Sequence, residues 1–214
     1  MSIKDFLKQL IEGYLFYDLD SMSKIALTPG QYIGAANYPI VLSTISGMEI
    51  LGFILQPDNN LFSNRKGDEY FGYYWDEYFA EHEPKYKHLK KLFRKLIRHG
   101  LAHTFLTKNQ IYITKGSNKQ ILINSKQNKV CFDAIVFYKD FFDSYNNLVK
   151  PIINNVTLNP KTSLQNMQLK LDSLEDQYKK DTIMVFEELA NNFIEFTDII
   201  PHMNDKITIS GLDL

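Results

Sequence analysis

The feature that most constrains the fold is an apolar stretch over residues 38–55. Its length touches the lower limit for a membrane span. Glu49 lies inside this stretch together with Pro39 and several hydroxyl side chains, and an isolated carboxylate in lipid is costly. We therefore predict a buried core helix, against which neighbouring helices pack closely at small residues such as Gly47.

The rest of the chain predicts a mainly α fold. Ser2 with Asp5 three residues later predicts the start of a first helix. Two β-branched stretches with a turn between them predict a β-hairpin, followed by a short third strand. The expected helices cover 3–20, 70–79, 85–104, 134–153 and 164–196, the last as one long helix or a pair, and the expected strands cover 110–114, 120–124 and 129–132.

With 214 residues the chain has room for one domain, or one domain plus an appendage. We divide it at the first predicted strand. Residues 1–106 form a helical bundle, and residues 107–214 add the hairpin and the C-terminal helices. We expect the second part to pack on the first, so that the two make one compact unit.

Residues 70–79 hold seven aromatic side chains. On a helix, five of them would share one broad face. Such rings can stack on nucleic-acid bases. Aromatic stripes are more often core or dimer interface, and we favour that interpretation.

Charge is divided unevenly along the chain. No Asp or Glu occurs between Glu83 and Asp133, and this interval holds twelve Lys and Arg residues, although the whole chain has a net charge of −1. The interval could present a positive face to a polyanion, or it could dock on the acidic remainder of the same protein. The sequence favours neither over the other.

Two features bear on the compartment. Cys131 is the only cysteine, which excludes an intramolecular disulfide and favours a reducing environment. Asp5 lies where a signal peptide would have its apolar run. We therefore expect a cytoplasmic protein with no membrane association.

The segment with the clearest candidate for catalytic chemistry is residues 96–105, at the end of the helix expected over 85–104. Here Arg98 is followed by a polar residue, His99, then three residues, then His103. Arginine offers a fixed fork of donors to phosphate oxygens, and histidine exchanges protons near neutral pH. His99 and His103 are four apart, but no acid nearby in sequence completes a zinc site, so we expect no metal and no cofactor.

This Arg–polar–x3–His pattern, at the end of a late helix in a helical bundle, resembles the HEPN superfamily. The resemblance implies a HEPN-like bundle over about residues 3–106. It also implies a metal-independent endoribonuclease, in which a homodimer places two copies of the motif across its axis. Carried onto this chain, His103 is the general acid/base, Arg98 holds the scissile phosphate, and His99 orients the site. Toxin and phage-defence proteins of this superfamily suggest an antitoxin or partner protein as well.

Further residues follow from charge and position. Lys87, Lys91 and Arg94 share a helix face with Arg98 and could track the RNA backbone. Glu49 is the candidate acid to support Arg98, and an acid of the first helix (Glu12, Asp18 or Asp20) is the alternative.

One geometric point opposes catalysis. On a straight helix Arg98 and His103 lie about 140° apart, so they converge only through a bend or helix end near Gly100, or through a second subunit. Arginine and histidine at a helix end can also be structural, because they interact favourably with its terminal carbonyls. The alternative function is therefore a non-catalytic, HEPN-like dimeric binding or assembly module.

Overall fold

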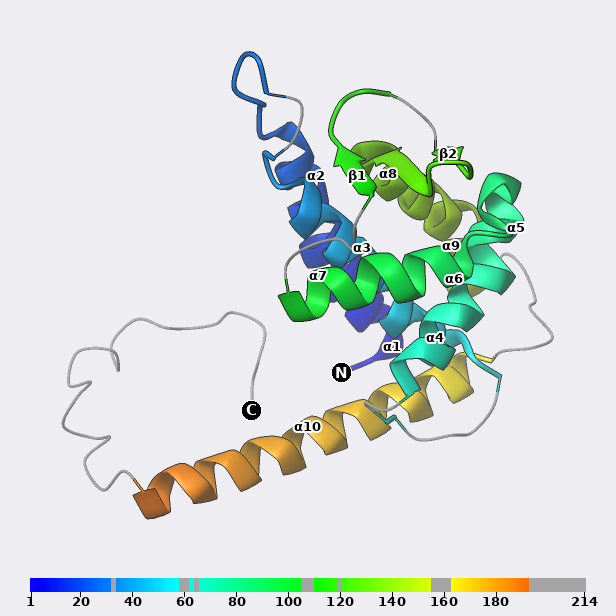
Figure 1. Cartoon of the computed structure of the whole chain (residues 1–214). Helices are drawn as coiled ribbons and strands as arrows, with labels where there is room; N and C mark the ends of the chain where they lie inside the picture. Colours follow the sequence, from blue (N-terminus) through cyan, green and yellow to red (C-terminus); the bar gives the residue numbers. More distant parts are fainter. Residues whose placement is uncertain are drawn as a thin grey trace. The chain divides into compact units, whose positions relative to one another are not determined.

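A computed structural model of the chain describes residues 1–31, 34–57, 62–63, 66–104, 110–118, 121–154 and 163–192. In these ranges the chain is mostly helical with one small sheet, so the predicted mainly α fold is confirmed (Figure 1). The chain divides into two compact units, Met1–Ser173 and Leu174–Leu214. Every residue of the candidate site described below belongs to the first unit.

The first helical run confirms the predicted N-terminal helix and extends it. The amide of Asp5 donates a 3.1 Å hydrogen bond to Ser2 Oγ, which caps the helix start. The middle of the run is π-helical, and the run ends four residues later than expected, at Lys24. Its segments are α1 (Ile3–Phe6), η1 (Leu7–Phe16) and α2 (Tyr17–Lys24).

The predicted core helix is confirmed as α3 (Asn37–Leu55), which packs against α2, α4 and α8. Ile45, Met48 and Leu51 are fully buried. A Cβ atom at Gly47 would lie 2.5 Å from Leu15 Cδ2, so the glycine allows the close approach we expected. Among the described residues, α3 alone is long and apolar enough to cross a membrane, but 61% of its apolar window is buried inside the protein, as in a core helix.

The aromatic segment lies in the core. Tyr70, Phe71, Tyr74, Trp75, Tyr78 and Phe79 are each at most 4% exposed. The indole Nε1 of Trp75 donates a 3.2 Å hydrogen bond to the backbone carbonyl of Tyr86. The core interpretation is thus confirmed, and these rings are not open to bases. The segment consists of α4 (Gly67–Tyr74), η3 (Trp75–Phe79) and α5 (Ala80–His82).

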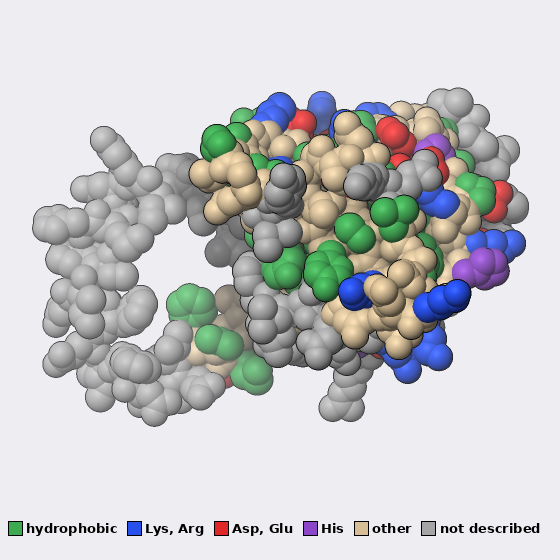
Figure 2. Space-filling model, turned by 45° about the horizontal axis from the view of Figure 1, so that its top comes forward, with side chains coloured by type: hydrophobic (Ala, Val, Ile, Leu, Met, Phe, Trp, Pro, Cys, Tyr) green, Lys and Arg blue, Asp and Glu red, His purple; other side chains and the backbone are tan. Residues whose placement is uncertain are grey.

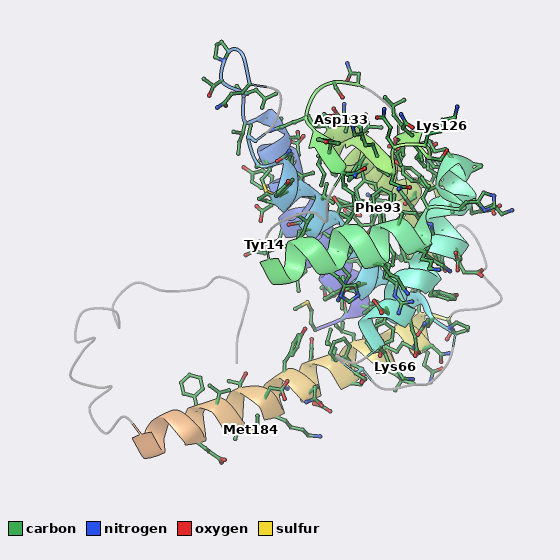
Figure 3. The ribbon with its side chains drawn as sticks, viewed as in Figure 1. Tyr14, Lys66, Phe93, Lys126, Asp133 and Met184 are labelled. Carbon is green, nitrogen blue, oxygen red and sulfur yellow. The ribbon has the colours of Figure 1, made fainter. Side chains whose placement is uncertain are left out.

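The predicted helix over 85–104 is interrupted near its start. A 3-10 turn precedes it, because Pro84 sets the backbone there, and the continuous helix begins at Lys90. Phe93 anchors this helix to α8 through a stacked contact with Phe137, their ring centroids 4.7 Å apart (Figure 3). We call residues 90–104 the basic helix. The elements are η4 (Pro84–Tyr86), α6 (Lys90–Leu92), η5 (Phe93–Arg98) and α7 (His99–Thr104).

All three predicted strands exist, but the predicted hairpin is wrong in its pairing. The strand order is β1-β3-β2, in which β1 (Ile111–Thr114) pairs in parallel with β3 (Lys129–Asp133), and β2 (Leu122–Asn124) pairs antiparallel with β3. The hairpin therefore joins β2 and β3. Burial explains the arrangement, since Ile111 and Ile113 of β1 and Val130 and Phe132 of β3 are all buried, whereas β2 is exposed throughout.

Asp133 ends the sheet and starts the next helix (Figure 3). Its Oδ1 accepts hydrogen bonds from the amides of Ile135 and Val136, at 2.9 and 3.2 Å, which caps the helix. The predicted helix over 134–153 is confirmed. It consists of α8 (Ala134–Ser144), the π-helical η6 (Tyr145–Val149) and α9 (Lys150–Ile153).

The C-terminal region forms one long helix, α10 (Leu164–Asn192), over its described residues. Its residues 164–173 belong to the first unit. Gln168 Oε1 accepts a 2.7 Å hydrogen bond from the amide of Ile3, and its Nε2 donates to the Met1 carbonyl at 2.9 Å. Met167 and Leu171 of this helix are buried. The predicted helix or helix pair extends to residue 196, and its part beyond Asn192 lies outside the described residues.

Candidate functional site at the junction of three helices

Five side chains from three helices meet in what we call the charge cluster. Glu49 comes from α3, Asp68 from the first turn of α4, and Arg94, Arg98 and His99 from the basic helix. Close packing of α3 on α4 makes this possible. A Cβ atom at Gly52 would lie only 1.9 Å from the Tyr70 carbonyl oxygen, so the two backbones meet where only glycine fits.

Arg98 and Glu49 form a two-pronged ion pair. Arg98 Nη2 donates a 3.1 Å hydrogen bond to Glu49 Oε2, and Arg98 Nε contacts Glu49 Oε1. The side chains are 24% and 20% exposed. The pair lies against Gly67, where a Cβ atom would be 3.3 Å from Arg98 Nη2. Such a fork holds the guanidinium in one orientation.

Asp68 joins the other two members of the cluster. Its Oδ2 accepts a hydrogen bond from Arg94 Nη2, and its Oδ1 lies 3.9 Å from His99 Nε2. The hydrogen bond from Arg94 holds the pKa of the Asp68 carboxyl below its usual range, although partial burial opposes this shift. Asp68 Oδ1 is buried and accepts no hydrogen bond from any described residue. It therefore faces the imidazole without a close donor.

The cluster is electrically balanced and partly open. Two carboxylates face two guanidinium groups, and the imidazole of His99 lies beside one of the carboxylates. His99 and Arg94 are 39% and 40% exposed, which leaves them accessible to a ligand in solvent. Guanidinium donors beside an accessible imidazole can bind a phosphate and move a proton. No group of three or more metal-ligating side chains occurs among the described residues.

The structure places the predicted site residues as follows. Of the four acids considered as partners of Arg98, Glu49 is the one that pairs with it. Lys87 and Lys91 are exposed and form no ion pair within the described ranges. Arg94, expected to contact RNA, is bound to Asp68. His103 lies in α7, but its side chain is outside the described part of the protein.

A helix end near Gly100, one of the three ways in which Arg98 and His103 could converge, is not found, and the helix ends at Thr104, as predicted. The backbone stays helical from Lys90 to Thr104, with a π-helical segment that finishes at Arg98. Ile97 and Leu101 on either side of Gly100 are buried, and their packing keeps the helix intact despite the glycine. Arg98 and His103 are therefore placed as on a continuous helix, about 140° apart around its axis.

Asp68 is the cluster member that the sequence reasoning missed. It lies in the aromatic segment, which we assigned to the core because of its rings. It is also 26 residues from Arg94 in sequence. An acid in the first turn of a helix is already explained by the helix dipole. Asp68 lies opposite the basic helix, which contains no acid. This pairing can be recognised only once the packing of α4 against the basic helix is known.

Comparison with known proteins finds no match for this chain, whether among family models, curated proteins or solved structures.

Proposed function

We propose that this chain is a HEPN-like, metal-independent endoribonuclease that acts as a homodimer. Arg98 holds the scissile phosphate, His103 transfers the proton, and His99 orients the site. The observation that carries the proposal is the charge cluster. It fixes Arg98 by Glu49 and sets His99 beside Asp68 at a partly exposed helix junction.

The chemistry of the proposal needs no metal. Cleavage by attack of the ribose 2′-hydroxyl requires a base at that oxygen and an acid at the leaving 5′-oxygen, and it leaves a 2′,3′-cyclic phosphate. Histidine serves both roles near neutral pH. The guanidinium of Arg98 offsets the charge that develops on the phosphorane. Glu49 acts as a positioning residue, because it orients the donors of Arg98.

A second candidate function is a non-catalytic dimeric binding or assembly module with the same fold. The charge balance of the cluster favours this second function. Arg94 and Arg98 each face a carboxylate, and a neutralised guanidinium attracts phosphate less strongly.

Cleavage of RNA in the presence of EDTA tests the proposal. We expect the wild type to release cyclic-phosphate ends and His103→Ala to release none. His88→Ala is the matched control, because His88 is an exposed histidine outside the charge cluster, and it should cleave like the wild type. Cleavage retained in His103→Ala overturns the assignment of His103. If the wild type is folded and dimeric but inactive, the binding module replaces the ribonuclease as the proposed function.

Arg98 needs a test that separates catalysis from folding. Arg98→Ala leaves the Glu49 carboxylate without its partner, so lost activity alone is ambiguous. The double variant Glu49→Gln/Arg98→Ala removes that uncompensated charge. We expect it to fold, by circular dichroism, and to remain inactive, whereas activity in this variant contradicts the role of Arg98.

A further inference from the structure

The outer face of the small sheet carries a row of exposed apolar side chains. The register pairs Tyr112 with Cys131 and Cys131 with Leu122, so these three residues lie side by side across the strands. Tyr112 is 50% exposed and Leu122 is 53% exposed, while Cys131 between them is half-buried. Side chains of neighbouring positions point to the opposite face, where Ile111 and Val130 are buried.

Lysines border this row. Lys129 pairs with Asn124 two register positions away from the pair of Leu122 and Cys131, on the same face, and both residues are exposed. Lys126 lies in the turn that joins β2 to β3 and is exposed as well (Figure 3). Figure 2, in which the top of Figure 1 comes forward, shows hydrophobic side chains next to lysine or arginine side chains on this side of the protein.

No acid balances these charges within the segment. The nearest Asp or Glu in sequence is Asp133, the last residue of β3, which is 2% exposed. Its Oδ2 accepts hydrogen bonds from the amide and the hydroxyl of Ser117, at 2.6 and 2.8 Å, and its Oδ1 caps α8. The lysines therefore face solvent with their charge uncompensated by Asp133, and a polyanion is the complementary ligand.

We propose that this face, formed by Tyr112, Leu122, Lys126 and Lys129, binds single-stranded RNA. An exposed aromatic ring beside lysines fits an unpaired base and its phosphates, because bases stack on aromatic side chains irrespective of sequence. A strand-adding peptide fits less well, since β2 offers an edge of only three residues. Two large exposed side chains are also few for a stable protein interface.

The choice of RNA over single-stranded DNA rests on the proposed function, whereas the surface itself does not depend on it. The experiment therefore measures binding and not cleavage. A fluorescein-labelled oligouridylate of about 12 nucleotides, modified with 2′-O-methyl groups so that it resists cleavage, is titrated with the protein and followed by anisotropy. If the protein binds this oligonucleotide but cleaves no RNA, the proposed nuclease function is refuted and the proposed binding face is not.

Tyr112→Ala should weaken binding by between about fivefold and a hundredfold, because one stacked base is lost. Tyr112→Phe keeps the ring and should bind within about twofold of the wild type, whereas Tyr17→Ala removes a tyrosine that is 68% exposed on α2 and should have no effect. Equal affinity in Tyr112→Ala and Tyr17→Ala, or a Tyr112→Phe variant as weak as Tyr112→Ala, overturns the proposal.

The lysines have a separate signature. Lys126→Gln/Lys129→Gln should lower the slope of log affinity against log salt by roughly 0.7 for each lysine. An unchanged slope contradicts their contact with phosphate. Equal binding of an oligothymidylate overturns the assignment to RNA. Binding of phosphatidylserine vesicles without binding of the oligouridylate assigns the face to lipid instead.

Discussion

The ammonium of Lys115, in the turn after β1, donates a 2.6 Å hydrogen bond to the backbone carbonyl of Ala35. The same Nζ donates to the carbonyls of Met22 and Ile25, each also at 2.6 Å, and Lys115 is only 5% exposed. One buried cation thus satisfies the end of α2 and the chain that leads into α3.

Lys115→Met should destabilise the protein by about 2–3 kcal/mol, because it removes three hydrogen bonds that a buried ammonium donates to backbone carbonyls. Lys139→Met, at an exposed position of α8, is the control and should change stability by less than about 0.5 kcal/mol. Urea unfolding measures both. Equal effects of the two substitutions would show that the three hydrogen bonds contribute nothing.

Two glycines on neighbouring helices should respond oppositely to alanine. At Gly52 a Cβ atom meets the Tyr70 carbonyl oxygen at 1.9 Å, so Gly52→Ala should cost at least about 3 kcal/mol. At Gly72 the nearest atom is Lys90 Cδ at 3.9 Å, so Gly72→Ala should gain up to about 1 kcal/mol through helix propensity. The midpoint of thermal unfolding should fall for Gly52→Ala and rise for Gly72→Ala. A stable Gly52→Ala protein would refute the close contact between α3 and α4.

The charge cluster should make stability depend on pH through Asp68. The hydrogen bond from Arg94 lowers the pKa of Asp68 in the folded chain. At pH values around the unfolded pKa, the folded state therefore binds fewer protons than the unfolded state. The resulting stability is present above the unfolded pKa, about 4, and is lost as pH falls through the folded pKa. Asp68→Asn should therefore be less stable than the wild type at pH 7, by about 1 kcal/mol, and this difference should shrink on acidification.

Asp76→Asn provides the comparison for Asp68→Asn, because Asp76 is 49% exposed and pairs with Lys90. Its effect at pH 7 should be smaller than that of Asp68→Asn. Denaturant unfolding at several pH values measures both variants. A difference between Asp68→Asn and wild type that persists unchanged to pH 3 would rule out the ion pair as its origin.

Trp75 is the only tryptophan and is fully buried among aromatic rings. Its ring centroid lies 4.9 Å from that of Phe79 and 5.1 Å from that of Phe93. Native fluorescence should therefore be blue-shifted and resistant to acrylamide quenching, with both properties lost on unfolding. Strong quenching of the folded protein would contradict this core.

Much of the helical structure follows from local signals in the sequence. Ser2 with Asp5 marks a helix start that the structure contains, and the burial of Glu49 with Arg98 follows from a carboxylate that an apolar helix cannot leave unpaired. Helical periodicity does not report strand order. Both Ile111 and Ile123 occur in β-branched stretches, but only burial on the helices distinguishes β1 from the exposed β2.

The long-range polar contacts could not be predicted from the sequence, for a similar reason. Lys115 was one of twelve basic residues in an acid-free interval, and nothing local marks it as buried. Its role depends on carbonyls about 80 to 93 residues away. Asp68 likewise acquires its partner only through the packing of helices.

The hydrogen bonds of Gln168 to Met1 and Ile3 have a consequence for biosynthesis. Residues at the two ends of the first unit contact each other, so this unit cannot be completed until about residue 173 has left the ribosome. Until then, the nascent chain lacks Met167 and Leu171, which are buried in the finished protein, and their apolar neighbours stay uncovered. Folding of the first unit is therefore completed only after its last residues have emerged, and shorter nascent chains expose apolar side chains that the finished unit buries.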